Sequence, residues 1–182
     1  METAGELKRL QGEAALGRRY LAALRQEVIR LALLADDALE GAVLEKVTEK
    51  LGEDASGLCA KLQMGMRAML LSAHPALSSA YANDVDPLMC YAQQLFVMGR
   101  KQDVVIGLST SGNAENIQNV FKVAGGLGIR RILFTGNRHG KCERYADCVI
   151  AVPESETYRI QELHLPVYHA VCIMLEEYFY GK

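Results

Sequence analysis

Residues 103–128 constrain this chain more than any other stretch, because the patterns of a strand, a loop and a helix follow one another within it. The run VVIGL at 104–108 is short and rich in β-branched residues, which is typical of a buried parallel strand. Apolar residues then recur at helical spacing from Ile117 to Leu127 and indicate one apolar helix face. The segment therefore predicts a strand, a polar loop and a helix, in that order.

The loop between strand and helix, residues 109–113, reads STSGN, and we call it the hydroxyl loop. Its position before a helix N-terminus favours an anion, because free backbone N–H groups and the helix dipole both point there. The hydroxyls of Ser109, Thr110 and Ser111 could donate to phosphate oxygens. The alternative is a serine-rich turn whose side chains only cap the helix. The sequence leaves both interpretations open.

The second half of the chain alternates short apolar runs with helical patterns. Strands are predicted at 68–71, 131–134 and 148–152, and a long helix at 157–180. Such alternation implies right-handed crossovers and a parallel sheet covered by helices on both faces, which is a three-layer αβα sandwich. Ligands of such sheets bind beyond the carboxyl ends of the strands, where the hydroxyl loop lies.

Composition narrows the class of protein. The 182 residues suffice for one domain, and the net charge of −2 argues against a dedicated nucleic-acid surface. The 5 cysteines form no CxxC pair, which favours free thiols in a reducing compartment. The polar N-terminus lacks a secretory signal, and no uncharged run reaches membrane-spanning length. We therefore expect a cytoplasmic protein with neither a membrane nor a nucleic-acid partner.

Residues 5–34 have the pattern of a long amphipathic helix. Such a helix, outside the α/β core, has no obvious surface within the same domain on which to bury its apolar stripe. It could fold back on its own domain or pack against a second copy of the chain. We favour the second possibility and expect a homo-oligomer.

The helix predicted at 157–180 carries the histidines of most interest. Glu162 and His169 are seven residues apart and share a face, with Gln161 in a broad sector of that face. His164 lies about 140° around the helix from His169 and is expected to point elsewhere. A neutral imidazole suits acid–base chemistry or metal binding. The alternative for His169 is a histidine buried at a helix interface.

Two separated motifs resemble a known family. GLSTSGNAENI at 107–117 resembles the phosphosugar-binding loop of SIS (sugar isomerase) domains, and ETYRIQELHLPVYHAVCIMLEEYF at 156–179 resembles the C-terminal helix of the phosphoheptose isomerase branch. The resemblance covers roughly residues 62–180. It implies a flavodoxin-like parallel sheet within a single SIS domain, residues 1–182. Residues 1–34 would be an oligomerisation helix of a homotetramer, and residues 62–182 the α/β core.

The same resemblance implies roles for individual residues. Asn83 and Asp84, in a loop before a helix predicted at 87–98, would reach sugar hydroxyls, although an Asx-turn is the alternative without the family. Gln161 would hold substrate or metal, and His169 would act as acid–base group or zinc ligand. The implied reaction converts sedoheptulose 7-phosphate to a heptose 7-phosphate through an enediol.

The sequence also departs from the family pattern. Residues 30–60 contain no GNGGS-like loop and no histidine, so the strand–loop–helix unit that carries a catalytic glutamate and histidine is absent, by deletion or by omission from the sequence. Ala114 replaces a third serine. Relatives often bind zinc through His, Glu, Gln and His, and only Gln161 and His169 remain here, an incomplete zinc site. The alternative function is a non-catalytic SIS module that binds a phosphosugar or a protein.

Overall fold

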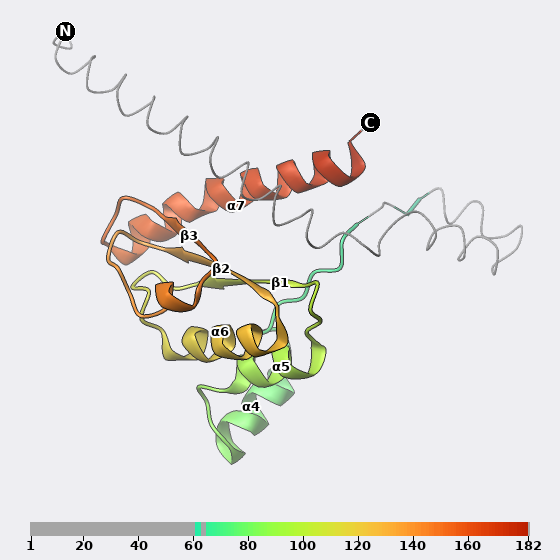
Figure 1. Ribbon diagram of the computed structural model, residues 1–182, viewed down its shortest axis with the longest axis vertical. Coiled ribbons are helices and arrows are strands. Elements are labelled where there is room, and N and C mark those ends of the chain that lie inside the picture. Colours follow the sequence, from blue (N-terminus) through green and yellow to red (C-terminus); the bar gives the residue numbers. More distant parts are fainter. Residues whose placement is uncertain (1–60, 63–64, 182) are drawn as a thin grey trace, which may run out of the picture.

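The computed structural model describes residues 61–62 and 65–181, and its centre is a parallel sheet (Figure 1). The strands are β1 (Val104–Leu108), β2 (Arg130–Thr135) and β3 (Cys148–Ala151), in the order β1-β2-β3. Their β-branched and aromatic residues suit a pleated, buried surface. The register pairs Leu108 with Phe134 and Thr135 with Ala151. All three strands therefore end at the same edge of the sheet.

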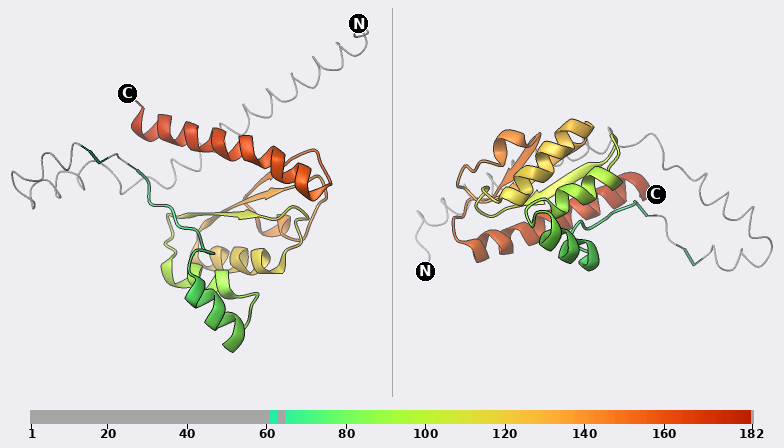
Figure 2. Two further views of the ribbon diagram at one scale, coloured as in Figure 1. Left: turned by 180° about the vertical axis from the view of Figure 1, so that it is seen from behind. Right: turned by 90° about the horizontal axis from the view of Figure 1, so that it is seen from below.

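Helices cover both faces of this sheet. In all the views of Figures 1 and 2, α7 (Thr157–Tyr180) lies on one face, and α6 (Glu115–Leu127) lies on the other with α5 (Cys90–Met98) beside it. Helix α4 (Pro75–Asp84) packs on α5 at the outside. A single 3-10 turn, η1 (Glu143–Tyr145), precedes β3. The predicted three-layer α/β architecture is confirmed in this part of the chain.

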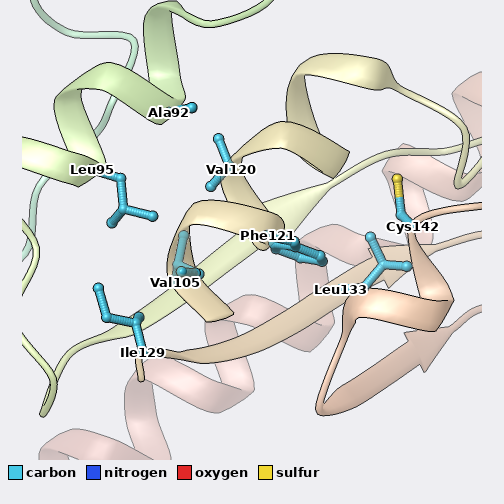
Figure 3. Packing of buried hydrophobic residues seen from close by; sticks show 9 residues of the cluster. Ala92, Leu95, Val105, Val120, Phe121, Ile129, Leu133 and Cys142 are labelled. Carbon is cyan, nitrogen blue, oxygen red and sulfur yellow. The ribbon is translucent and has the colours of Figure 1, made fainter. Parts of the chain in front are cut away.

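The larger of two apolar clusters joins the sheet to α5 and α6 (Figure 3). Phe121 and Leu133 are fully buried in it. A β-carbon at Gly107 would lie 2.8 Å from Ile117 Cγ2 and 2.9 Å from the Phe121 ring. Glycine is therefore required in β1 because it lets α6 approach the strand closely, and this approach fixes the start of α6 at the end of β1.

A second cluster joins α7 to the opposite face. Ile132, Phe134 and Ile150 of the sheet pack against Val171 of α7. The helix runs without interruption through Pro166 and has the predicted bounds. The apolar contacts of α7 are thus made mainly with β2 and β3 rather than with β1.

Beside β1 the sheet is less covered. Ile106 and Leu108 point away from α6 and are 48% and 56% exposed. In the described part of the chain β1 is an edge strand. An exposed apolar edge of this kind is normally covered by further structure.

Three predictions about the segment before β1 are wrong. Residues 68–71 form no strand, and Leu70 is largely exposed. The run AMLL lacks β-branched residues and finds no partner strand, so its apolar character alone does not make it a strand. Asn83 and Asp84 lie in the last turn of α4 rather than in a loop. The next helix begins at Cys90, because residues 87–89 form a turn.

Several predictions concern residues that lie outside the described part of the chain. They are the amphipathic helix at 5–34 and the missing strand–loop–helix unit. In the described ranges, no helix combines the length and the apolar character needed to cross a membrane.

Candidate functional site

The hydroxyl loop follows β1 directly and turns sharply. The Gly112 N–H donates to the carbonyl of Ser109 at 2.9 Å, and Gly112 adopts a φ of 65°, a left-handed conformation that favours glycine. This turn directs the chain from the strand into α6. The loop therefore lies at the carboxyl edge of the sheet, as predicted.

The serines of the loop have different environments. Ser109 is buried, and its Oγ accepts from the Ala114 N–H at 3.3 Å, just before the first residue of α6. Ser111 is exposed, and its Oγ accepts from the Asn113 N–H at 3.2 Å. A hydroxyl that accepts a hydrogen bond still has its own proton to donate. Ser109 thus stabilises the turn before α6, whereas Ser111 presents a hydroxyl to solvent.

The N-terminus of α6 has no side-chain cap: its N-cap residue is Ala114, which cannot accept a hydrogen bond through its side chain. The Glu115 and Asn116 N–H groups have no acceptor among the described residues. Uncapped N–H groups at the positive end of a helix dipole attract an anion. The Glu115 carboxylate, in the same first turn, opposes an incoming anion.

A second loop, residues 136–142, docks on the hydroxyl loop. The Cys142 N–H donates to the Gly112 carbonyl at 2.8 Å, and the Lys141 N–H donates to Asn113 Oδ1 at 3.0 Å. The Asn113 side chain also donates from Nδ2 to the Ser111 carbonyl at 2.9 Å. Asn113 therefore stabilises the turn of the hydroxyl loop and also holds this loop against the 136–142 loop.

Glycines permit this close approach. A β-carbon built on Gly140 would lie 2.5 Å from Gly112 Cα and closer still to the Gly112 carbonyl group. Real β-carbons do not come so near to another backbone. Gly140 must therefore be glycine for the two loops to touch as they do.

Charged side chains surround the 136–142 loop. Arg138, His139 and Lys141 are exposed, and His139 Nδ1 lies 2.9 Å from Glu143 Oε2. His139 therefore lies in a solvent-exposed turn. The two exposed cations next to the hydroxyl loop give this edge of the sheet a local positive charge, which favours an anionic ligand.

Cys142 lies beneath the hydroxyl loop. Its side chain is fully buried, and its Sγ donates to the Ala114 carbonyl at 3.6 Å. Burial raises the pKa of the Cys142 thiol, against an opposing hydrogen bond from Ser109. A buried, neutral thiol packs and does not act as a nucleophile.

The α7 residues separate into buried and exposed groups. Gln161, Glu162 and His169 are all exposed, and the His169 ring centroid lies 5.1 Å from that of Tyr168. His169 is therefore not part of the core that the described residues form. His164 is the buried one, 2% exposed, and its Nε2 lies 3.1 Å from the Thr135 carbonyl oxygen. Its predicted divergence from His169 is correct.

The His164 ring is neutral. Burial lowers the pKa of its imidazole, although the hydrogen bond to Thr135 works in the opposite direction. Because a carbonyl only accepts, Nε2 must carry the proton in this contact. His164 was not predicted as a functional residue. It lies one helical turn after Ile160, which is also buried.

Asn83 and Asp84 are not joined to the hydroxyl loop in this structure. Both are exposed at the end of α4, and no hydrogen bond or ion pair links them to any described residue of the loop. In the segment after α4, the Leu88 carbonyl accepts a hydrogen bond from Asn119 Nδ2 of α6 at 3.4 Å.

The described residues do not fit zinc. No group of three or more His, Cys, Asp or Glu side chains in this part of the chain could hold a metal ion. Gln161 and His169 alone supply fewer donors than the three protein ligands that a catalytic zinc normally has. We assign no chemical step to a metal.

Known proteins have sequences similar to that of this chain. Residues 91–175 match the SIS domain family. A phosphoheptose isomerase from Helicobacter pylori is 36% identical over 118 residues, which is 65% of this chain and 62% of that protein. One from Akkermansia muciniphila is 37% identical over 116 residues, covering 64% of this chain and 61% of the relative. The match thus spans about three fifths of the length of these relatives.

Solved structures agree with the sequence matches. The phosphoheptose isomerase from Neisseria gonorrhoeae superposes with a TM-score of 0.60 at 28% identity, over 88% of this chain and 99% of that one. A phosphoheptose isomerase from Francisella tularensis has the same fold, with a TM-score of 0.64 at 22% identity, over 97% and 100% of the two chains.

The parallel sheet with its hydroxyl loop therefore resembles that of a SIS domain, the family whose model matches residues 91–175. The similar proteins named above are phosphoheptose isomerases, in agreement with the resemblance of the two sequence motifs.

Proposed function

We propose that this protein is a sugar-phosphate isomerase of the phosphoheptose isomerase type, acting on sedoheptulose 7-phosphate. The observation that carries the proposal is the hydroxyl loop at the uncapped start of α6, in a chain whose relatives are phosphoheptose isomerases. Ser111, the free N–H groups of Glu115 and Asn116, and the nearby Lys141 would hold the phosphate.

The phosphate site would then position the other end of the sugar. An aldose–ketose isomerisation needs a base to take the proton from C1 and return it to C2 through an enediol, while a polar group stabilises the developing oxyanion. Holding the phosphate fixes the two carbons against these groups and lowers the entropic part of the barrier. His169 is our candidate for the acid–base group, and Gln161 for a substrate contact.

The remaining site residues are proposed on the resemblance. Asn83 and Asp84 would reach the sugar hydroxyls. In this chain alone they are not joined to the hydroxyl loop, and His169 is exposed. We therefore propose that the complete site forms in a homo-oligomer, a tetramer, in the cytoplasm. The exposed apolar side chains of Ile106 and Leu108 beside β1 support the oligomer. The free thiols of Cys90, Cys142 and Cys172 support the cytoplasmic location.

The test is the substitution Ser111→Ala, with Ser79→Ala, an exposed serine of α4, as the matched control. Loss of one hydrogen bond to a charged phosphate costs about 1.5–3 kcal/mol, or roughly tenfold to a hundredfold in affinity. Calorimetry with sedoheptulose 7-phosphate should register this loss for Ser111→Ala and none for Ser79→Ala. Equal affinities for both variants would exclude this loop as the phosphate site.

A second candidate function is a non-catalytic module that binds a sugar phosphate without converting it. The exposed position of His169 and Gln161 in the single chain favours it. The two functions differ in one result, since the module would bind sedoheptulose 7-phosphate through Ser111 and leave it chemically unchanged.

A further inference from the structure

His164 is a buried polar side chain with no role in the proposed chemistry. It comes from α7, which also carries Gln161 and His169, and it is only 2% exposed. Its ring stands edge-on to Phe134 of β2, with 5.4 Å between centroids and 84° between planes. Its Nε2 donates to the Thr135 carbonyl at 3.1 Å. Burying an imidazole costs desolvation free energy. An apolar residue would therefore be more favourable at this position unless the hydrogen bond contributes to the structure of the site.

The Thr135 carbonyl, which accepts this hydrogen bond, belongs to a peptide unit that is bonded to several elements around the site. The Thr135 carbonyl also accepts from the Val152 N–H at 3.0 Å, at the end of β3. The next residue, Gly136, donates its N–H to the Thr110 carbonyl of the hydroxyl loop at 3.1 Å, and Thr135 Oγ1 donates to the same carbonyl at 3.5 Å. One peptide unit therefore connects α7, β3 and the hydroxyl loop.

We propose that His164 is a positioning residue, which sets α7 in register with the hydroxyl loop through the junction His164–Thr135–Thr110. The inference rests on the proposed function in one respect: the groups that it positions are Gln161 and His169 on one side and the phosphate loop on the other.

The geometry explains why a polar contact is needed. The contacts of Val171 of α7 with the sheet are apolar, and apolar packing is non-directional. A slip of α7 by one residue would move its side chains about 1.5 Å along the axis and rotate them about 100°. His169 would then face another direction. A single ring N–H directed at one carbonyl excludes such a slip, because the displaced ring would leave both partners unpaired inside the core.

A steric contact supports the same register. A β-carbon at Gly136 would lie 2.5 Å from Ile160 Cδ1 of α7. The helix therefore lies directly against the peptide that joins it to the hydroxyl loop. Ile160 packs closely at this point. His164, one turn later, adds a directional hydrogen bond that fixes how the helix is rotated and placed along its axis.

The experiment compares three variants of the full chain. His164→Leu removes the donor and keeps an apolar side chain, and His164→Gln offers an amide N–H in its place. Val171→Ala weakens the apolar packing of α7 without touching Thr135. Each variant is first checked for folding by its thermal transition, and those that fold are carried forward.

The first measurement does not depend on the proposed reaction. Hydrogen exchange followed by mass spectrometry is read in the peptide that contains the hydroxyl loop, without ligand. His164→Leu should speed exchange in this loop by about tenfold or more, as expected when a local opening becomes easier. His164→Gln should restore most of the protection, and Val171→Ala should leave the loop unchanged. Unchanged exchange in His164→Leu, or equal acceleration in Val171→Ala, would overturn the proposal.

The second measurement uses sedoheptulose 7-phosphate. His164→Leu should lower kcat by about tenfold to a hundredfold, the loss that a displacement of the acid–base group on the order of 1 Å produces, with partial rescue in His164→Gln. Val171→Ala should keep kcat. If the wild type turns over nothing, the proposed reaction fails, and the exchange result still decides whether the junction exists. A kcat in His164→Leu equal to that of the wild type would refute the positioning role.

Discussion

Gly140→Ala is the substitution that tests the architecture of the site most sharply. The added β-carbon would lie 2.5 Å from Gly112 Cα, whereas carbon atoms pack at about 3.5 Å or more. The 136–142 loop and the hydroxyl loop must therefore separate by about 1 Å. Gly140 does not adopt a positive φ, so the strain comes from this contact and not from the backbone conformation of residue 140.

The structure sets the size of the effect. The separation would break the Cys142–Gly112 hydrogen bond of 2.8 Å and the Lys141–Asn113 hydrogen bond of 3.0 Å. Two such bonds contribute about 1 kcal/mol each, and crowding in a packed region adds about 1–3 kcal/mol where the loops do not relax. We expect Gly140→Ala to lower the free energy of unfolding by about 2–5 kcal/mol and to weaken sugar-phosphate binding at least tenfold.

The assay is urea denaturation followed by calorimetry with sedoheptulose 7-phosphate. Gly126→Ala is the matched control, because a β-carbon there meets nothing within 4 Å and the position is inside α6. Alanine is the better helix former by about 1 kcal/mol, so the control should be as stable as the wild type or more stable. If both variants unfold at the same urea concentration and bind equally, the two loops do not touch as described.

Two further predictions concern the same edge of the sheet and its support. Asn113→Ala removes the acceptor of the Lys141 N–H and the donor to the Ser111 carbonyl. The affinity for sugar phosphate should therefore fall several-fold, and urea denaturation should show a free energy of unfolding lower by about 1 kcal/mol. Unchanged affinity would show that Asn113 does not hold the two loops together. The Arg131 guanidinium lowers the pKa of Asp147, mainly through its hydrogen bonds of 2.8 and 2.9 Å. A carboxyl with a lowered folded-state pKa stabilises the fold above its unfolded-state pKa of about 3.9, and this stabilisation is lost as the pH falls through the lower folded-state value. Asp147→Asn should therefore cost about 1 kcal/mol at pH 7 and flatten the stability profile below about pH 4, and an unchanged acid profile would show that the pair contributes nothing.

The parts that the sequence predicted are those that local patterns determine. The β-branched runs at β1, β2 and β3 and the apolar periodicity of α6 and α7 each fix an element without reference to the rest of the chain. The run at 68–71 shares the apolar character without the β-branched residues and has no neighbour to pair with. Strand formation there would have needed a partner, which a local pattern does not reveal.

The site was predicted only in part for the same reason. The hydroxyl loop is a local motif, and its place at the end of β1 follows from the order of strand, loop and helix. The 136–142 loop reaches it through Asn113 and Gly112, more than 20 residues away in the sequence, and His164 reaches Thr135 over a similar distance. Such contacts depend on the strand order and register of the sheet. The capping interpretation was wrong for Ser109, because its buried hydroxyl bonds the Ala114 N–H before the first residue of α6 and leaves the helix without a side-chain cap.

The most direct test of the proposed function is the conversion of sedoheptulose 7-phosphate in D₂O by the purified chain, followed by NMR. An enediol mechanism passes the migrating proton through a base that can exchange with solvent. We predict that a heptose 7-phosphate accumulates and carries deuterium at C2, and that Ser111→Ala slows its formation. Tight binding of the sugar phosphate with no conversion and no exchange at C1 would contradict the isomerase function and identify the protein as a binding module.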